Sequence, residues 1–320
     1  MMEIISDPVA EKNFIPVSKI VISHHGTRDV VASLAKVSGA SSPKLLMNSS
    51  PASPGSLPGI LETMTIEQVR DFNPEVVVIP IGSTEPHGPH LPYGTDLFIA
   101  EAVTGEAVRL ANAENARVLR LPALPISNNV NFKKFPFACR IRVETLMALL
   151  KDLVDFVCEE GVRKIVIVNC HGGNDAILAS LRQSYDQHQN RAFVCLCHSC
   201  SFSDGAYDGF FNDGSPHAGD FETSMIYAIK PELIVENKLK PSKMNQPAIS
   251  RLGKPGVDWV RPWHVLMSES YSGNPELASS EKGRQFLDIC AAGMAKFLIE
   301  LSREPWHEQF PYPPQSGGNI

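Results

Sequence analysis

No hydrophobic run in this 320-residue sequence is long enough to cross a bilayer, which excludes a protein built from transmembrane helices. Basic stretches are also missing, and 29 Lys and Arg against 35 Asp and Glu give a net charge of -6, which argues against a nucleic-acid partner. Residues 1–12 carry acids where a secretory signal has a basic start and an apolar core. The 7 cysteines are an odd number spread along a long chain, unlike a secreted disulfide framework. We therefore expect a cytoplasmic protein that binds neither membranes nor nucleic acid.

Composition divides the chain into three regions. Residues 1–60 include a Ser-, Pro- and Gly-rich run with little to bury, so we expect an irregular N-terminal extension or arm. Residues 61–305 alternate apolar and amphipathic segments and are expected to form one folded domain. Residues 306–320 are rich in Pro and Gly and are expected to be a C-terminal tail, ordered only where it docks.

The middle region has the pattern of an α/β domain. Continuous apolar, β-branched runs predict buried strands over residues 75–81, 116–121, 164–168 and 192–196. Helical spacing of apolar residues predicts helices over residues 96–111 and 143–159. Such alternation predicts a mostly parallel sheet flanked by helices.

Two local signals mark where helices begin. Thr65 and Gln68 have the spacing of a capping box, which predicts a short helix ending near Phe72. Asn174 is positioned to cap the helix that follows the strand predicted over residues 164–168.

Three polar clusters stand at the ends of these elements. GSTEPHGPHLPYGTD (82–96) follows the first strand, NCHGGN (169–174) follows a later strand, and HAGDFETS (217–224) enters another helix. Sites in parallel α/β sheets lie beyond the carboxyl ends of the strands, so we expect these clusters to be neighbours.

The clusters offer three carboxylates and two imidazoles: Glu85, His87, Asp96, His171 and Glu222. This mixed oxygen and nitrogen set suits Zn, Mn or Fe rather than a cysteine-rich structural zinc site. Five ligands are too many for one open zinc and suit two divalent metal ions that share a carboxylate. The alternative is that these residues only cap helices and satisfy loop backbone.

The three clusters together resemble the signature segments of the creatininase (creatinine amidohydrolase) family, and the resemblance extends over residues 61–283. It implies a creatininase-like three-layer sandwich with a two-metal centre, often assembled as a hexamer. Members of the family hydrolyse creatinine, formamides, a mycofactocin precursor peptide or inosose-like keto-sugars.

The resemblance also implies roles for individual residues. Glu85 and His171 would bind one metal and His87 the other, with Asp96 as the bridge between them. In creatininase the remaining carboxylate lies two residues after the histidine of the second cluster, where this chain has Gly173.

Glu222 of the third cluster is the expected replacement for that carboxylate, as a metal ligand within the catalytic centre. His217 would contact the substrate or donate a proton. Trp263 is a further candidate for the wall of the substrate pocket, the alternative being that it simply packs.

Two loops depart from the family pattern. Phe137 stands where glycine is usual, Arg140 also differs, and the segment around Asn129 lacks a histidine that relatives carry. We therefore expect Phe137, Arg140 and Asn129 to contact a substrate different from creatinine, with drift in a surface loop as the alternative. An aromatic ring can stack on a planar substrate, and an arginine favours a substrate with a carboxylate or several hydroxyls.

The leading hypothesis is a hydrolase in which a water activated by two metals cleaves a C–N bond in a small amide, cyclic or open-chain, other than creatinine. An alternative is ring opening of a keto-sugar, inosose or lactone at the same metals. A third, from another class, is a metal-free binding or scaffold protein that kept the fold. The family resemblance further implies a homo-oligomer, with a hexamer as the form expected from the family, acting on a small molecule.

Overall fold

The computed structural model describes residues 58–184, 192–215, 217–257 and 259–314. The chain divides into two units, residues 1–52 and 53–320. The first unit lies outside the described residues, and with it nearly all of the expected N-terminal extension.

Four parallel strands form the sheet in the order β2-β1-β3-β4. Their bounds are Val76–Ile81 (β1), Val118–Arg120 (β2), Lys164–Asn169 (β3) and Phe193–His198 (β4). Each coincides with one of the predicted runs. In register, Val76 of β1 lies opposite Lys164 of β3, and Ile81 lies opposite Asn169. The two central strands therefore end side by side.

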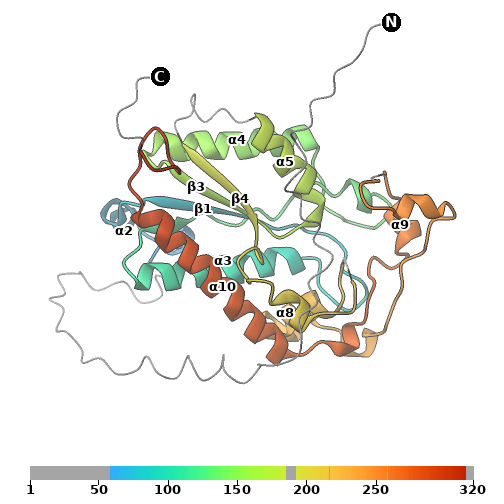
Figure 1. Cartoon of the computed structure of the whole chain (residues 1–320). Helices are drawn as coiled ribbons and strands as arrows, with labels where there is room; N and C mark the ends of the chain where they lie inside the picture. Colours follow the sequence, from blue (N-terminus) through green and yellow to red (C-terminus); the bar gives the residue numbers. More distant parts are fainter. Residues whose placement is uncertain (1–57, 185–191, 216, 258, 315–320) are drawn as a thin grey trace, which may run out of the picture. The chain divides into compact units, whose positions relative to one another are not determined.

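Helices cover both faces of the sheet. The longer ones are α3 (Thr95–Ala113), α4 (Val143–Glu159), α5 (Asp175–Ser184), α8 (Asp220–Ile229) and α10 (Ser280–Arg303). The shorter ones are α2 (Ile66–Phe72), α7 (Tyr207–Phe210) and α9 (Trp263–Leu266). Single 3₁₀ turns occupy Leu61–Thr63, Val130–Phe132, Gly172–Asn174, Pro231–Leu233, Glu236–Lys238, Ser250–Gly253 and Pro275–Leu277. Figure 1 shows α4 and α5 on one side of the sheet, with α3 and α10 on the other.

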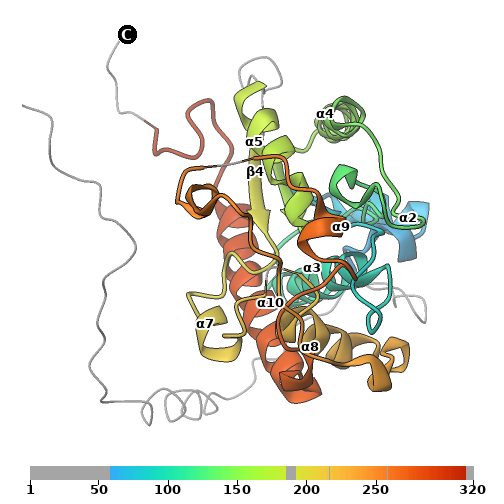
Figure 2. The ribbon, with the colours of Figure 1, turned by 90° about the vertical axis from the view of Figure 1, so that its right-hand side faces the viewer.

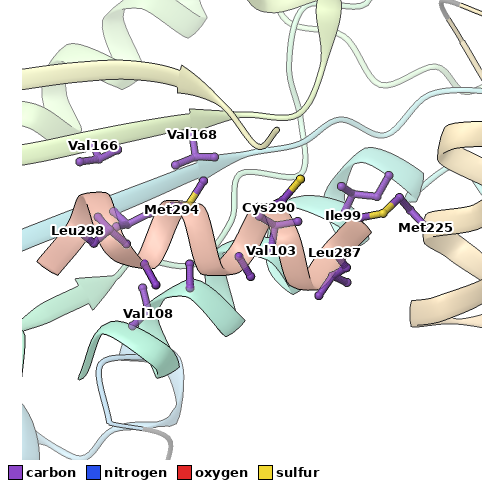
Figure 3. Close-up of a cluster of buried hydrophobic side chains, with 14 of the residues drawn as sticks. Ile99, Val103, Val108, Val166, Val168, Met225, Leu287, Cys290, Met294 and Leu298 are labelled. Atoms are coloured by element: carbon purple, nitrogen blue, oxygen red, sulfur yellow. The ribbon is translucent and has the colours of Figure 1, made fainter. Parts of the chain in front are cut away.

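Alternation along the buried strands creates the two cores of this three-layer sandwich. Successive side chains of a strand point to opposite faces, so Val166 and Val168 of β3 join the core under α3 and α10. Ile165 and Ile167 join the core under α4 and α5. Figure 3 shows the first core, where Met294 of α10 packs toward the β3 valines. The predicted three-layer α/β fold is thus confirmed.

The local signals had different outcomes. The Thr65–Gln68 capping box forms, and α2 ends at Phe72 as predicted. The cap predicted at Asn174 does not form, because its buried Oδ1 accepts no hydrogen bond from the described residues and its amide instead donates to Asn169. In the tail, Phe310 is buried against Phe193 of β4, so this part of the tail docks on the chain's own sheet.

The strands place their carboxyl ends on one side of the domain, and the polar clusters follow them there. In Figure 1 this is the right-hand side, and Figure 2 faces it, with α9 in front and α8 below. Among the described helices, none is both long and apolar enough to cross a membrane.

Candidate metal centre

The chain brings the five predicted ligands together from four places. Glu85 and His87 lie in the loop after β1, Asp96 in the first turn of α3, His171 just after β3, and Glu222 in the first turn of α8. All are buried except Glu222, whose side chain is 15% exposed. Because β1 and β3 are adjacent and parallel, their trailing loops meet at one edge of the sheet.

One group of ligand atoms gathers around His171. Its Nδ1 lies 3.1 Å from Oε2 of Glu85 and 3.3 Å from Oδ2 of Asp96. The other ring nitrogen, Nε2, lies 3.2 Å from the carbonyl oxygen of Asn128. A carbonyl can only accept, so Nε2 carries a proton and Nδ1 is the atom left to face the two carboxylates.

A second group gathers around His87. Its Nε2 lies 3.1 Å from Oδ1 of Asp96 and 3.8 Å from Oε2 of Glu222. Its Nδ1 donates to the carbonyl oxygen of Glu85 at 3.0 Å, which fixes the ring with Nε2 toward the carboxylates. Asp96 therefore presents one oxygen to each imidazole and belongs to both groups.

The buried carboxylates of both groups favour positive charge nearby. Burial alone would lower the pKa of His87, but the carboxylates of Asp96 and Glu222 outweigh it and raise that pKa to about 10. Burial opposes a charged His171 as well, yet Glu85 and Asp96 raise its pKa. Burial also raises the pKa of Glu222. Carboxylates this deeply buried are costly unless protons or cations stand between them.

Divalent metal ions would supply positive charge between these carboxylates. Oδ2 of Asp96 is buried without a hydrogen-bond donor among the described residues, although it faces the Nδ1 of His171. Two acceptor oxygens and an imidazole nitrogen that converge in this way form the donor set of a divalent cation once that nitrogen has released its proton. Three trios of described residues have ligand atoms within 4.8 Å of one another. The two that contain Asp96 suit a pair of ions on either side of it, and the third joins Glu85 and His87 to His217.

The surroundings of Gly173 explain why the fifth ligand is Glu222 rather than a carboxylate two residues after His171. A Cβ at this position would lie 2.3 Å from Nε2 of His171 and 2.9 Å from the carbonyl oxygen of Asn128. No acidic side chain fits there without displacing the His171 ring. Glu222 instead approaches from α8, where the backbone N–H of Ala218 donates to its Oε2.

His217 lies beside the two groups. Its Nε2 is 2.9 Å from the carbonyl oxygen of Pro86, so Nε2 carries the proton, and its Nδ1 is 3.9 Å from Oε1 of Glu85. Burial and the neighbouring His87 lower the pKa of His217 to about 4. A neutral ring with a free Nδ1 next to the ligand cluster can accept a proton and return it.

A cavity of about 250 Å³ opens onto the centre. Its walls include Glu85, Asp96, His171 and Glu222, together with His217. The lining also includes Phe132, Met244, Arg261, Trp263, Leu266 and Met267. The ring of Trp263 packs 4.7 Å from Phe132 and 5.4 Å from His217, between ring centroids. Trp263 therefore lies in the wall, where it was predicted.

The other three predicted substrate contacts lie elsewhere. Asn129 is buried, with its amide bonded to Ser83 and to the carbonyl oxygen of Cys139, while the neighbouring Asn128 lines the cavity. Phe137 is 93% exposed, and its φ of 49° explains the glycine that is usual there. Arg140 is exposed and does not line the cavity.

Sequence reasoning missed groups that act through the backbone. The carbonyls that orient His171 and His217 belong to Asn128 and Pro86, and a carbonyl leaves no mark in residue type. Ser83, which donates to Glu85, could have been found from its place two residues before that carboxylate. Arg261 comes from an irregular segment far along the chain, and no periodicity signals its position.

Comparison with known proteins gives consistent matches. A creatininase family model, described as creatinine amidohydrolase, matches residues 62–298. The mycofactocin precursor peptide peptidase of Mycobacterium ulcerans (strain Agy99) is 31% identical over 253 residues, 75% of this chain and 92% of that protein. The 3-dehydro-scyllo-inosose hydrolase of Thermotoga maritima is 26% identical over 274 residues, 78% of this chain and 84% of that protein. A solved creatinine amidohydrolase structure has a TM-score of 0.64 at 20% identity, covers 78% of this chain and 100% of its own, and shows the shared fold.

Proposed function

The chain belongs to the creatininase family, a family of hydrolases, and on that basis we propose that it cleaves a C–N bond in a small amide with two divalent metal ions as cofactors. The observation that carries the proposal is the division of Asp96 between two imidazoles. A carboxylate with one oxygen toward each ligand group is the bridge that a two-metal centre needs. Zn, Mn and Fe all suit the donor set.

In the proposed centre, Glu85 and His171 would hold one ion, His87 and Glu222 would hold the other, and Asp96 would serve both. When bound, the ions supply an activated water and polarise the carbonyl of the substrate. The chain's part is to fix the ligands, which it does through the backbone carbonyls that lock the imidazole rings.

His217 is the proposed proton carrier. Its Nε2 is held by Pro86, so only Nδ1 can take a proton from the attacking water. The same atom then donates this proton to the leaving nitrogen, which converts a poor leaving group into a neutral amine. Phe132 and Trp263 flank the ring and limit the access of bulk water to it.

Two relatives bear on the bond that is cleaved. A peptide bond is a C–N bond, and the Mycobacterium ulcerans relative at 31% identity is named for cleaving a precursor peptide. Ring opening of a keto-sugar is the second candidate, favoured by the 26% identity with an inosose hydrolase. Both reactions need an attacking water and a polarised carbonyl, so one centre serves either.

A substrate panel on metal-loaded protein tests the proposal. The panel contains N-formyl amines, cyclic amides including creatinine, short peptides and keto-sugars, with release of amine or loss of the keto-sugar as readouts. We expect turnover of at least one C–N substrate, little turnover of creatinine, and loss of turnover in His171→Ala. Turnover of none of them, or turnover that survives His171→Ala, would contradict a metal-dependent hydrolase.

A further inference from the structure

Arg261 lines the cavity at the metal centre, and nothing in the described part of the chain pairs with it. It lies two residues before α9, and among the described residues its guanidinium makes no hydrogen bond, ion pair or ring contact. A guanidinium presents five donors in a planar fork that matches the two oxygens of a carboxylate. An unpaired fork at the wall of a cavity can therefore receive an anionic group.

The carboxylates of the same cavity do not need Arg261. Glu85, Asp96 and Glu222 face the imidazoles and the proposed metal ions. Asp175, the remaining acid in the lining, accepts from Asn169 and lies 3.1 Å from Nε2 of His198. The acids of the lining therefore have other partners, and none of them pairs with the positive charge of Arg261.

The surroundings of Arg261 favour a ligand that brings its own acceptor. The indole Nε1 of Trp263 is buried and has no acceptor among the described residues. Other nearby parts of the lining, Met244, Leu266 and Met267, carry no charge. Apart from histidines, Arg261 is the one cationic side chain among the described residues that line this cavity.

We propose that Arg261 binds a carboxylate carried by the substrate, so that the amide cleaved at the metal centre belongs to an anionic molecule such as an N-acyl amino acid or a short peptide. This inference rests on the function proposed above and adds a substrate class to it. A carboxylate is favoured over a phosphate ester because a single arginine matches one negative charge, whereas a phosphate monoester carries nearly two. Arg140, the arginine that the sequence suggested for this role, does not line the cavity.

Metal-binding probes test the inference independently of turnover. Hydroxamates chelate divalent ions, so butyrohydroxamic acid and succinomonohydroxamic acid differ only in a methyl group against a carboxylate at the far end. A shorter and a longer homologue of succinomonohydroxamic acid test the distance between the metal ions and Arg261, and a phosphonate analogue tests the type of anion. Calorimetry on zinc-loaded protein gives each affinity, with metal content measured on the same samples.

The matched variants are Arg261→Gln and Arg251→Gln. Arg251 is an exposed arginine ten residues earlier that does not line the cavity. We expect the best carboxylate probe to bind the wild type at least about tenfold more tightly than its neutral partner, as for a hydrogen bond to a charged group. Arg261→Gln should remove that preference and leave the affinity of the neutral probe and the metal content unchanged. Arg251→Gln should change none of the affinities.

Each outcome separates the two proposals. Equal binding of carboxylate and neutral probes to the wild type, or a preference that survives Arg261→Gln, overturns the carboxylate site and leaves the hydrolase proposal standing. A phosphonate that binds tenfold more tightly than every carboxylate overturns the choice of anion. If no hydroxamate binds although zinc is present, the metals are not open to a ligand, and the proposed function falls together with the inference.

Discussion

The shared position of Asp96 predicts an asymmetry between two carboxylate variants. Oδ1 of Asp96 is 3.1 Å from His87 and Oδ2 is 3.3 Å from His171, so Asp96→Asn should weaken both metal sites. Glu222 approaches His87 alone, at 3.8 Å, so Glu222→Gln should weaken one site and spare the other. Both changes keep the shape of the side chain and remove its charge.

The expected magnitude follows from ligand chemistry. Loss of an outer hydrogen-bonding partner of a metal ligand costs about 10- to 100-fold in affinity, so loss of a direct ligand should cost more than about 100-fold. Competition with a chromophoric chelator measures the two binding steps separately. For Asp96→Asn both steps should shift by that factor, and for Glu222→Gln only one.

Asp175→Asn provides the control, because Asp175 lines the same cavity but pairs with Asn169 and His198 outside the ligand groups. Its metal affinity should match that of the wild type. If Asp96→Asn keeps one site at full affinity, Asp96 is not the bridge. If Glu222→Gln weakens both sites equally, Glu222 and Asp96 have been given the wrong roles.

Three further predictions concern packing, protons and assembly. Gly283→Ala should lower the free energy of unfolding by about 1–3 kcal/mol, because the added Cβ would lie 1.8 Å from a backbone carbonyl oxygen of α8. Gly105→Ala has open space around the added Cβ and should raise the free energy of unfolding by about 0.5–1 kcal/mol. Equal effects in melting experiments would contradict the close approach of α8 and α10. Metal loading at pH 7 should release about two protons per chain, because the raised pKa values of His87 and His171 keep both rings protonated without metal. Since protons and metal ions compete for the same ring nitrogens, the affinity for metal should fall as the pH falls. Calorimetry in buffers of different ionisation enthalpy measures this, and zero release would contradict it. We expect the N-terminal extension to contribute to the interface of a homo-oligomer, so its removal should reduce the mass measured by light scattering. An unchanged mass would exclude the arm from the interface.

The strands could be predicted from the sequence because burial on both faces forces an unbroken apolar run. After the charged residue that begins each of them, EVVVIPI and KIVIV contain no residue that suits a solvated strand, and both runs form the centre of the sheet. The carboxyl ends of parallel strands lie on one side of a sheet, so Glu85 and His171 were expected on the same side, and the pairing of β1 with β3 makes them neighbours. Ligand residues that closely follow a predicted strand are therefore accessible to sequence reasoning.

Side chains in loops farther from the strand ends were not accessible in this way. The sequence shows that Phe137 replaces a glycine, but not that the backbone turns with a positive φ and leaves the ring exposed. Asn129 and Asn128 are adjacent and identical in type, yet only Asn128 lines the cavity. Arg261 joins the lining of the cavity from an irregular segment far along the chain, and no local pattern encodes that placement. The substrate wall of such a site has to be read from the fold.

The most direct test of the two-metal centre is a titration of metal-free protein with zinc or manganese, followed by binding and by turnover of the best substrate from the panel. The shared carboxylate predicts that binding saturates at about two ions per chain and that full turnover requires both. Saturation at a single ion with full activity, or no binding at all, would contradict the account.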